Sequence, residues 1–299
     1  MITADSYAAA IQLQEPFVPV PPRPDVSEAQ ALRETLEWLL AEHGQTVESV
    51  PADARPDVLI RNLLTIRRPG GIPTPIQACL DQVLAARARA RGAVEPGEVV
   101  AGPGPGGTLH GTSTKVWRGD ITRPSVDAIV NAANAELLGC FRPGHTCIDN
   151  AIHSAAGPRL RDDCARIIEI QGHPERSGNA KITRAYHLPS RFVLHTVGPI
   201  VAGGRVQPQD ERTLVSSYQS CLELARSMPS IRTLAFCAVS TGVFGYPKDR
   251  AAEVAVRTVR GWLREHPGAF DLIVFTVFSD DDEGAHERAM GAGEGDRIS

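Results

Sequence analysis

The feature that most constrains the fold is an alternation of short apolar runs with helical patterns in the last two thirds of the 299-residue chain. The runs, rich in β-branched residues, are 113–117, 128–131, 192–196, 233–239 and 272–278. Helical patterns lie between them at 148–168, 210–228 and 248–265. Strands that alternate with helices are typical of a layered α/β domain. Several of the runs are apolar enough for the centre of a largely parallel or mixed sheet.

The first hundred residues have a different texture, because they contain three helical patterns. These cover residues 27–44, a stretch that starts at Pro56, and about 75–91. The glycine- and proline-rich stretch 102–107 then breaks the pattern. We therefore predict a small helical module over residues 1–100 and an α/β domain over 101–299, with a linker at about 101–112 and a flexible tail at about 284–299.

The composition gives no electrostatic reason to expect nucleic-acid or membrane binding, since 22% of the residues are charged and the formal net charge is −4. No apolar run approaches the roughly 18–20 residues that a membrane span needs. We interpret Arg87, Arg89 and Arg91 as the solvated end of a helix in preference to an interaction patch. Most of the six cysteines lie in apolar segments. We expect a reduced, cytoplasmic, monomeric protein with no nucleic-acid or membrane partner.

The strongest local signal is a loop with two thiols and one imidazole, Cys140, His145 and Cys147, bent by Pro143 and Gly144. Zinc prefers such sulfur and nitrogen ligands, and three protein ligands leave one tetrahedral position for water or substrate. The spacing alone does not separate this catalytic arrangement from a structural zinc. Candidates for the fourth ligand of a structural zinc are His153, Cys164 and Asp149.

The loop leads into a helical pattern that begins near Ile148 and ends at Gly157. Asp149 then lies in the first turn, where the helix dipole favours an ionised carboxylate. An ionised carboxylate beside a metal can orient a nucleophile or stabilise developing positive charge. His153 follows one turn later on the same face, and we interpret it as a hydrogen-bonded packing histidine.

Two further segments are typical of nucleotide-binding loops. One loop follows an apolar strand and precedes a helix, so its backbone amides could face phosphates. Its residues are Ser240, Thr241, Gly242, Val243, Phe244 and Gly245. Asn131 and Asn134 likewise end a strand, where open α/β sheets bind ligands. Many α/β loops look like the first segment, and paired asparagines also form turns.

Together these segments resemble a macrodomain. The matching stretches are Gly119-Asp120-Ile121-Thr122, Asn131-Ala-Ala-Asn134, Ile148-Asp149 with Ala151-Ile152-His153 and Ala156-Gly157, His195-Thr-Val-Gly198-Pro199, and Ser240-Thr-Gly242-Val-Phe244-Gly245. Cys140, His145 and Cys147 replace the usual glycine-rich loop, which resembles the zinc-dependent subfamily of protein-ADP-ribose hydrolases. The resemblance covers residues 113–282 and extends more weakly to 62–69.

The resemblance implies a three-layer α/β/α fold with a central mixed sheet and ADP-ribose at the carboxyl ends of the strands. Asp120 would bind the adenine amino group, with Ile121 beside the ring. The loop from Ser240 to Gly245 would hold the diphosphate, with Phe244 near the distal ribose. Asn134 would contact that ribose in the catalytic region, and Asp149 matches the carboxylate implicated in catalysis. Cys140, His145 and Cys147 would bind Zn²⁺.

The function implied by the resemblance is zinc-dependent hydrolysis of mono-ADP-ribose from modified protein side chains, at the C1″ carbon of the distal ribose. Its substrates would be mono-ADP-ribosylated proteins, and a sirtuin-like ADP-ribosyltransferase would be a candidate functional partner. Two alternatives share the same binding residues: a reader that binds ADP-ribose without cleaving it, and an O-acetyl-ADP-ribose deacetylase. The fold alone does not decide among them.

Overall fold

Seven strands form one mixed sheet in the order β1-β2-β7-β6-β3-β5-β4 in the computed structural model, which describes residues 2–292. The strands are β1 (Gly106–Leu109), β2 (Thr112–Arg118), β3 (Ala128–Ala132), β4 (Ala180–Arg184), β5 (Phe192–Thr196), β6 (Thr233–Phe236) and β7 (Leu272–Val277). The five central strands are parallel, and β1 and β4 pair antiparallel at the two edges. The predicted mixed sheet is therefore confirmed, and the five predicted strands are its parallel centre.

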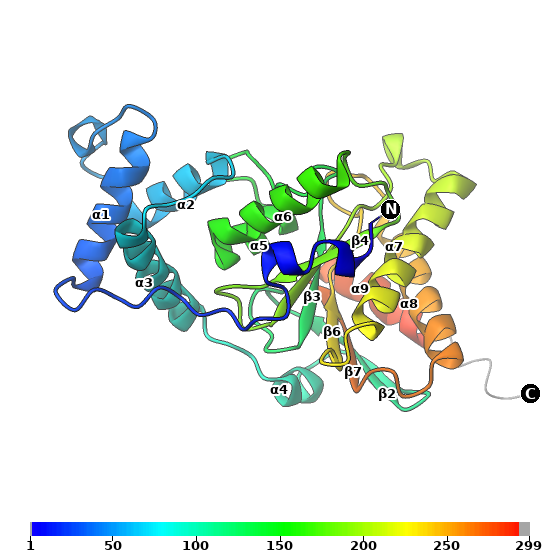
Figure 1. The fold of residues 1–299 in the computed structure, drawn as a ribbon. Helices are drawn as coiled ribbons and strands as arrows, with labels where there is room; N and C mark the ends of the chain where they lie inside the picture. Colours follow the sequence, from blue (N-terminus) through cyan, green and yellow to red (C-terminus); the bar gives the residue numbers. More distant parts are fainter. Residues whose placement is uncertain (1, 293–299) are drawn as a thin grey trace, which may run out of the picture.

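Helices cover both faces of this sheet, as the three-layer prediction requires (Figure 1). Helices α5 (Ile148–Ala156) and α6 (Pro158–Gln171) follow β3, whereas α7 (Pro208–Arg226), α8 (Lys248–Glu265) and α9 (Asp280–Gly291) follow β5, β6 and β7. The chain leaves β3 toward one edge of the sheet and leaves β5 and β6 toward the other. Right-handed crossovers then place the two groups of helices on opposite faces. The predicted helical stretch 148–168 is two helices, because Gly157 adopts a positive φ of 93° between them.

The predicted helical module is also present. It consists of α1 (Glu28–Ala41), α2 (Pro56–Ile66) and α3 (Thr74–Arg91), and a short helix α4 (Pro96–Ala101) leads from it to the sheet. The three helices share a separate apolar cluster of buried leucines and one isoleucine: Leu36, Leu39, Leu40, Ile60, Leu63, Leu64, Leu80 and Leu84. Both α2 and α3 contact α5, so the module packs beside the helix that carries Asp149 (Figure 1).

The first residues of the chain belong to the sheet domain and not to the helical module that precedes it in sequence. Two short 3₁₀ turns, Ala4–Ser6 and Ala9–Ile11, run beside α6 and β4. Tyr7, Ile11 and Leu13 are buried in the main core. The Tyr7 hydroxyl accepts a 3.0 Å hydrogen bond from the Ile182 amide of β4. This segment therefore supports the edge strand, a long-range contact that local sequence patterns do not encode.

Replacing Tyr7 by phenylalanine tests that support. The change keeps the ring and removes the oxygen that accepts the Ile182 amide, which leaves a buried donor unpaired. We expect the free energy of unfolding to fall by about 1–3 kcal/mol, measured by urea denaturation. Ser6→Ala, an exposed change on the same turn, is the control and should unfold like the wild type. A Tyr7→Phe protein as stable as the wild type would contradict this role.

Two stretches differ from the sequence-based expectation. The predicted linker at 101–112 contains β1, whose glycine-rich sequence Gly106–Leu109 carries little strand signal but pairs with β2. The predicted flexible tail at 284–299 begins inside α9, because Ser279 and Asp282 form a capping box and Ala285, His286, Ala289 and Met290 are buried. Residues 293–299 lie outside the described part of the chain.

No described helix is long and apolar enough to cross a membrane.

Candidate functional site

The carboxyl ends of the parallel strands bring the predicted site segments to one edge of the sheet. Strand β2 leads to Asp120, β3 to Asn134, and β6 to the loop that begins at Ser240. Strands β3 and β6 pair only through Ala128 with Leu234 and Ile129 with Ala235. The chain connections also diverge between these two strands, and open α/β sheets bind ligands at such a switch point.

Cys140, His145 and Cys147 gather as their spacing predicts. Their potential ligand atoms all lie within 4.8 Å of one another, and Cys140 Sγ is 3.5 Å from His145 Nδ1. The sulfur of Cys140 also accepts the Arg142 amide at 3.4 Å. All three side chains are half-buried, so the group could hold a metal ion and still be reached from solvent. No fourth His, Cys, Asp or Glu of the described residues joins this group.

Asn150 connects this loop to helix α5 and was not singled out by the sequence. Cys147 is the N-cap of α5, and its sulfur accepts the Asn150 amide at 3.4 Å. The Asn150 side chain donates a 2.8 Å hydrogen bond to the carbonyl oxygen of His145. One asparagine therefore contacts two of the three candidate ligands, through the backbone of His145 and the sulfur of Cys147. In the sequence, the only indication of a role for Asn150 is that it directly follows Asp149.

Asp149 lies in the first turn of α5, as predicted, and is buried. Its Oδ1 accepts a 2.8 Å hydrogen bond from Asn131 Nδ2 of strand β3. Burial raises the pKa of Asp149 to about 6, although the bond from Asn131 and the positive charge of Arg161 act in the opposite direction. The carboxylate is thus held in one orientation at the end of the loop that carries the candidate metal ligands.

Asn131, which was expected at the ligand-binding end of a strand, contacts His195, which had appeared only as part of a matching motif. The strand register pairs Asn131 of β3 with His195 of β5, and Asn131 Nδ2 lies 3.2 Å from His195 Nδ1. On its other side His195 Nε2 lies 3.0 Å from Thr183 Oγ1. Burial lowers the pKa of His195 to about 3, so the ring is neutral. A buried row of side chains therefore runs from β4 through Asn131 to Asp149.

His153 is buried one turn after Asp149, with Nε2 3.4 Å from Asp149 Oδ1. Burial, His195 and Arg161 lower its pKa well below the usual value, so it is neutral. Neither ring nitrogen has a hydrogen-bond partner in the described part of the chain. His153 therefore packs in the core, as predicted, but lacks the expected hydrogen bond. With Cys164 and His195 it forms a second, wholly buried group, separate from Cys140, His145 and Cys147.

Asn134, expected at the distal ribose, is engaged within its own loop. Its Nδ2 donates to the Gly139 carbonyl oxygen at 2.9 Å, and its Oδ1 accepts the Glu136 amide at 3.1 Å. These bonds shape the turn that leads into Cys140, which is the turn-forming role open to paired asparagines. Contact with a ribose stays a prediction.

The loop from Ser240 to Gly245 has features of a ligand-binding turn. Ser240 has a positive φ of 67°, which is costly for a residue with a Cβ, and its buried hydroxyl has no partner among the described residues. A Cβ on Gly198 would lie 2.0 Å from that hydroxyl, so only glycine fits opposite. The amides of Gly242, Val243 and Phe244 likewise have no acceptor within residues 2–292. These groups are available to an anion.

Toward the other edge of the sheet, Asp120 follows strand β2 and Phe278 follows the neighbouring strand β7. Asp120 Oδ1 accepts from the Thr122 amide at 2.9 Å and from the Thr122 hydroxyl at 2.8 Å. The Gly119 amide donates to the Val277 carbonyl oxygen at 2.9 Å, so Phe278 and Asp120 follow the ends of two paired strands, β7 and β2. Phe278 is 81% exposed, and an aromatic ring so exposed at the carboxyl edge of the sheet can stack on a base. Phe278 was not predicted as a site residue, because in the sequence it continues the apolar run of a buried strand. Ile121 is buried below.

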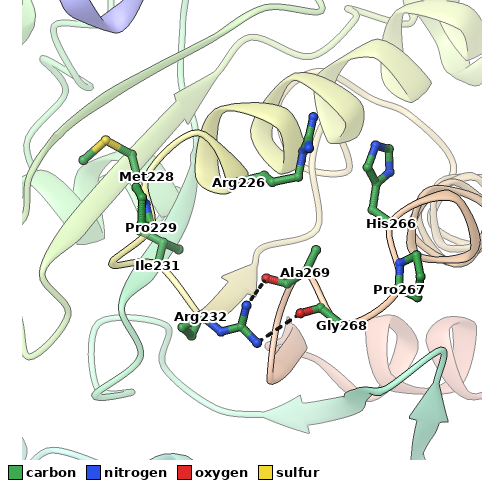
Figure 2. Close-up of a pocket in the computed structure, with 9 residues that line it drawn as sticks. All are labelled: Arg226, Met228, Pro229, Ile231, Arg232, His266, Pro267, Gly268 and Ala269. Atoms are coloured by element: carbon green, nitrogen blue, oxygen red, sulfur yellow. Dashed lines mark hydrogen bonds between the residues drawn. The ribbon is translucent and has the colours of Figure 1, made fainter.

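A pocket of about 310 Å³ lies elsewhere, at the amino ends of β6 and β7 (Figure 2). Arg232, which lines it, donates to the carbonyl oxygens of Ala269 and Gly268 and forms an ion pair with Asp271. Arg226, which also lines it, is paired with Glu223. Since its cations already have partners, the pocket offers less chemistry than the carboxyl edge of the sheet.

Comparisons with known proteins agree with this geometry. A family model described as Macro domain matches residues 130–255. A protein-ADP-ribose hydrolase of Treponema medium is 42% identical over 261 residues, which are 85% of this chain and 96% of that protein. A protein-ADP-ribose hydrolase of Staphylococcus aureus is 48% identical over 182 residues, which are 61% of this chain and 68% of that protein.

Among solved structures, a Trypanosoma brucei macrodomain in complex with ADP-ribose is similar to this chain with a TM-score of 0.55 and 35% sequence identity, covering 67% of this chain and 77% of that one. The match to the Treponema medium protein is longer than the sheet domain with its helices, so it extends into the helical module.

Proposed function

The chain belongs to the Macro domain family and is a protein-ADP-ribose hydrolase, and we propose that it releases mono-ADP-ribose from modified protein side chains with a bound zinc ion. The observation that carries the zinc role is the meeting of Cys140, His145 and Cys147 at the amino end of the helix that holds Asp149. The three candidate ligands and a carboxylate therefore lie at the same edge of the sheet.

The donor set fits zinc. Two thiolates and one imidazole are ligands that zinc prefers, and a set of three leaves one tetrahedral position for water or substrate. With usual bond lengths, a tetrahedral zinc separates a sulfur ligand from a nitrogen ligand by about 3.6 Å. Cys140 Sγ and His145 Nδ1 lie 3.5 Å apart, which supports the assignment.

ADP-ribose would lie along the carboxyl edge of the sheet. The adenine would bind at Asp120 and Ile121 with its face against Phe278, and the diphosphate at the free amides that follow Ser240. The distal ribose would then reach Asp149 and the metal ligands. The order of these groups along the edge is the order of strands β2, β7, β6 and β3.

Replacing Phe278 by alanine should weaken ADP-ribose binding by about tenfold, because stacking on an aromatic ring contributes about 1–3 kcal/mol per base. Isothermal titration of the metal-free protein with ADP-ribose measures the change. Phe278→Tyr keeps the aromatic face and should bind like the wild type. Equal affinity in Phe278→Ala would place the adenine elsewhere.

The chemistry follows from the bond that breaks. Cleavage at C1″ builds oxocarbenium-like charge on the distal ribose. The Asp149 carboxylate, oriented by Asn131, would stabilise that charge or position the attacking water. When bound, zinc supplies Lewis acidity to a water molecule or to a substrate oxygen. Because burial lowers the pKa of His153 and of His195, both rings are neutral and add no positive charge near Asp149 that would oppose a developing cation.

A hydrolysis assay tests this proposal against the two alternatives. The protein would be incubated with defined Ser-, Asp/Glu- and Arg-linked mono-ADP-ribosylated proteins and with O-acetyl-ADP-ribose. We expect catalytic release of ADP-ribose from at least one protein linkage. Tight binding with no release from any linkage would favour a reader, and turnover of the acetyl ester alone would favour a deacetylase. Asp149 and the three ligand side chains favour the enzyme, because binding alone does not need them.

A further inference from the structure

Phe141 sits next to Cys140 in the loop of candidate metal ligands, and two arginines from different parts of the chain lie over its ring. The guanidinium carbon of Arg161, from helix α6, is 4.5 Å from the ring centroid. That of Arg68, from the segment that follows helix α2, is 4.9 Å from it. Each contact is a cation–π interaction. The side chain after a metal ligand is thus held by the sheet domain and by the helical module together.

Arg161 makes the same connection through hydrogen bonds. Its Nε donates to the Leu138 carbonyl oxygen at 2.7 Å, two residues before Cys140. Its Nη1 donates to the carbonyl oxygens of Leu64, at 2.9 Å, and Arg67, at the end of helix α2. Arg161 is only 5% exposed, and its guanidinium satisfies carbonyl groups that would otherwise be buried without a donor. One side chain therefore joins the start of the loop to the helical module.

A third connection runs through Asn150, which holds the backbone of the loop. The hydroxyl of Thr65 in helix α2 donates to the Arg61 carbonyl oxygen at 2.8 Å and also lies 3.3 Å from Asn150 Oδ1, so it can share its proton between the two acceptors. Asn150 in turn donates to the His145 carbonyl oxygen and, through its amide, to Cys147 Sγ. Contacts from the module thus reach the loop at its start, next to Cys140, and at its end, next to Cys147. Between these points Arg142, Pro143 and Gly144 are exposed.

We propose that the helical module forms part of the metal centre, with Thr65 and Arg68 as positioning residues that hold the loop in its metal-binding conformation through Asn150 and Phe141. The inference rests on the proposed zinc role and adds to it. Three ligands on an eight-residue loop lose conformational freedom when they bind one ion. Contacts that fix the loop beforehand remove that cost, and partners of ligand residues commonly contribute about 10- to 100-fold in metal affinity.

The test measures zinc affinity in variants outside the ligand set. Phe141→Leu removes the aromatic face. The double change Thr65→Val with Arg68→Gln removes the two groups of the module that contact Asn150 and Phe141. Arg55→Gln changes an exposed arginine of the same module that is paired with nearby Asp57, and it is the control. Metal-free full-length protein is titrated with zinc against a chromophoric chelator, and ADP-ribose affinity is measured on the same samples by calorimetry.

We expect Phe141→Leu and the double variant each to weaken zinc binding by about tenfold, with ADP-ribose affinity within about twofold of the wild type and Arg55→Gln unchanged. Zinc affinity equal to the wild type in both variants would overturn the proposal. A parallel loss of ADP-ribose affinity would also overturn it, because the changes would then act on the whole domain. A wild-type protein that binds no zinc would instead overturn the metal role itself, and this inference with it.

Discussion

Cys140→Ala is expected to lower the rate of ADP-ribose release by at least about 100-fold while leaving ADP-ribose affinity within about twofold of the wild type. The loss follows because two ligands no longer hold the ion firmly, and the Lewis acidity of a bound metal contributes several kcal/mol to such reactions. Single-turnover release from a mono-ADP-ribosylated protein measures the rate, and metal analysis of the purified variant measures zinc.

The matched control is Thr146→Ala, which changes an exposed residue of the same loop that is not a ligand. It should retain both zinc and activity. Cys140 suits the substitution, because its side chain is half-buried and contacts Arg142, His145 and Cys147 of the same loop. Full activity of a zinc-free Cys140→Ala protein would show that these residues serve a structural role only.

Asp149→Asn is expected to reduce kcat by about a thousandfold with both zinc content and ADP-ribose affinity retained. Asparagine has nearly the same shape, but it carries no negative charge to stabilise the ribose or to accept a proton from water. Asn131 donates to Asp149 Oδ1 at 2.8 Å in the wild type. In Asp149→Asn, only one of the two side-chain atoms, the amide oxygen, can accept that hydrogen bond. Single-turnover kinetics on a linkage that the wild type cleaves measures the loss.

Glu136→Gln serves as the control for that change, because it removes a carboxylate at the same edge of the sheet from an exposed side chain. It should behave like the wild type. If Asp149→Asn and the wild type turned over equally fast, the carboxylate would have no part in the reaction. A loss of zinc in Asp149→Asn would instead make Asp149 part of the metal site.

The parallel centre of the sheet could be predicted from the sequence because its strands are rich in β-branched and apolar residues, for example Phe192–Thr196, which is buried throughout. Strand β4 was not predicted, because its two β-branched residues, Ile182 and Thr183, stand between Lys181 and Arg184. That lysine is buried because it pairs with Glu175, a partner that lies outside the strand. The start of α9 escaped prediction because its acidic first turn and its glycines resemble a solvated tail.

The candidate ligands were predictable because they are close in sequence, so local spacing carries the signal. The partners that orient them come from distant segments. Asn131 meets His195 only through the register of β3 and β5, and Phe141 meets Arg68 only when the module packs beside α5. Arg161, the residue that joins the loop to the module, lies in a helix where an arginine normally signals a solvated face. These pairings depend on tertiary structure, so no periodic pattern in the sequence indicates them.

The most direct test of the account is removal and return of the metal. The protein would be stripped with a chelator, assayed for release of ADP-ribose from a mono-ADP-ribosylated protein, and then restored with one equivalent of zinc. We expect that release of ADP-ribose stops in the stripped protein while ADP-ribose still binds. Zinc should restore release in the wild type but not in Cys140→Ala. Undiminished turnover by protein shown to contain no zinc would contradict the metal-assisted mechanism.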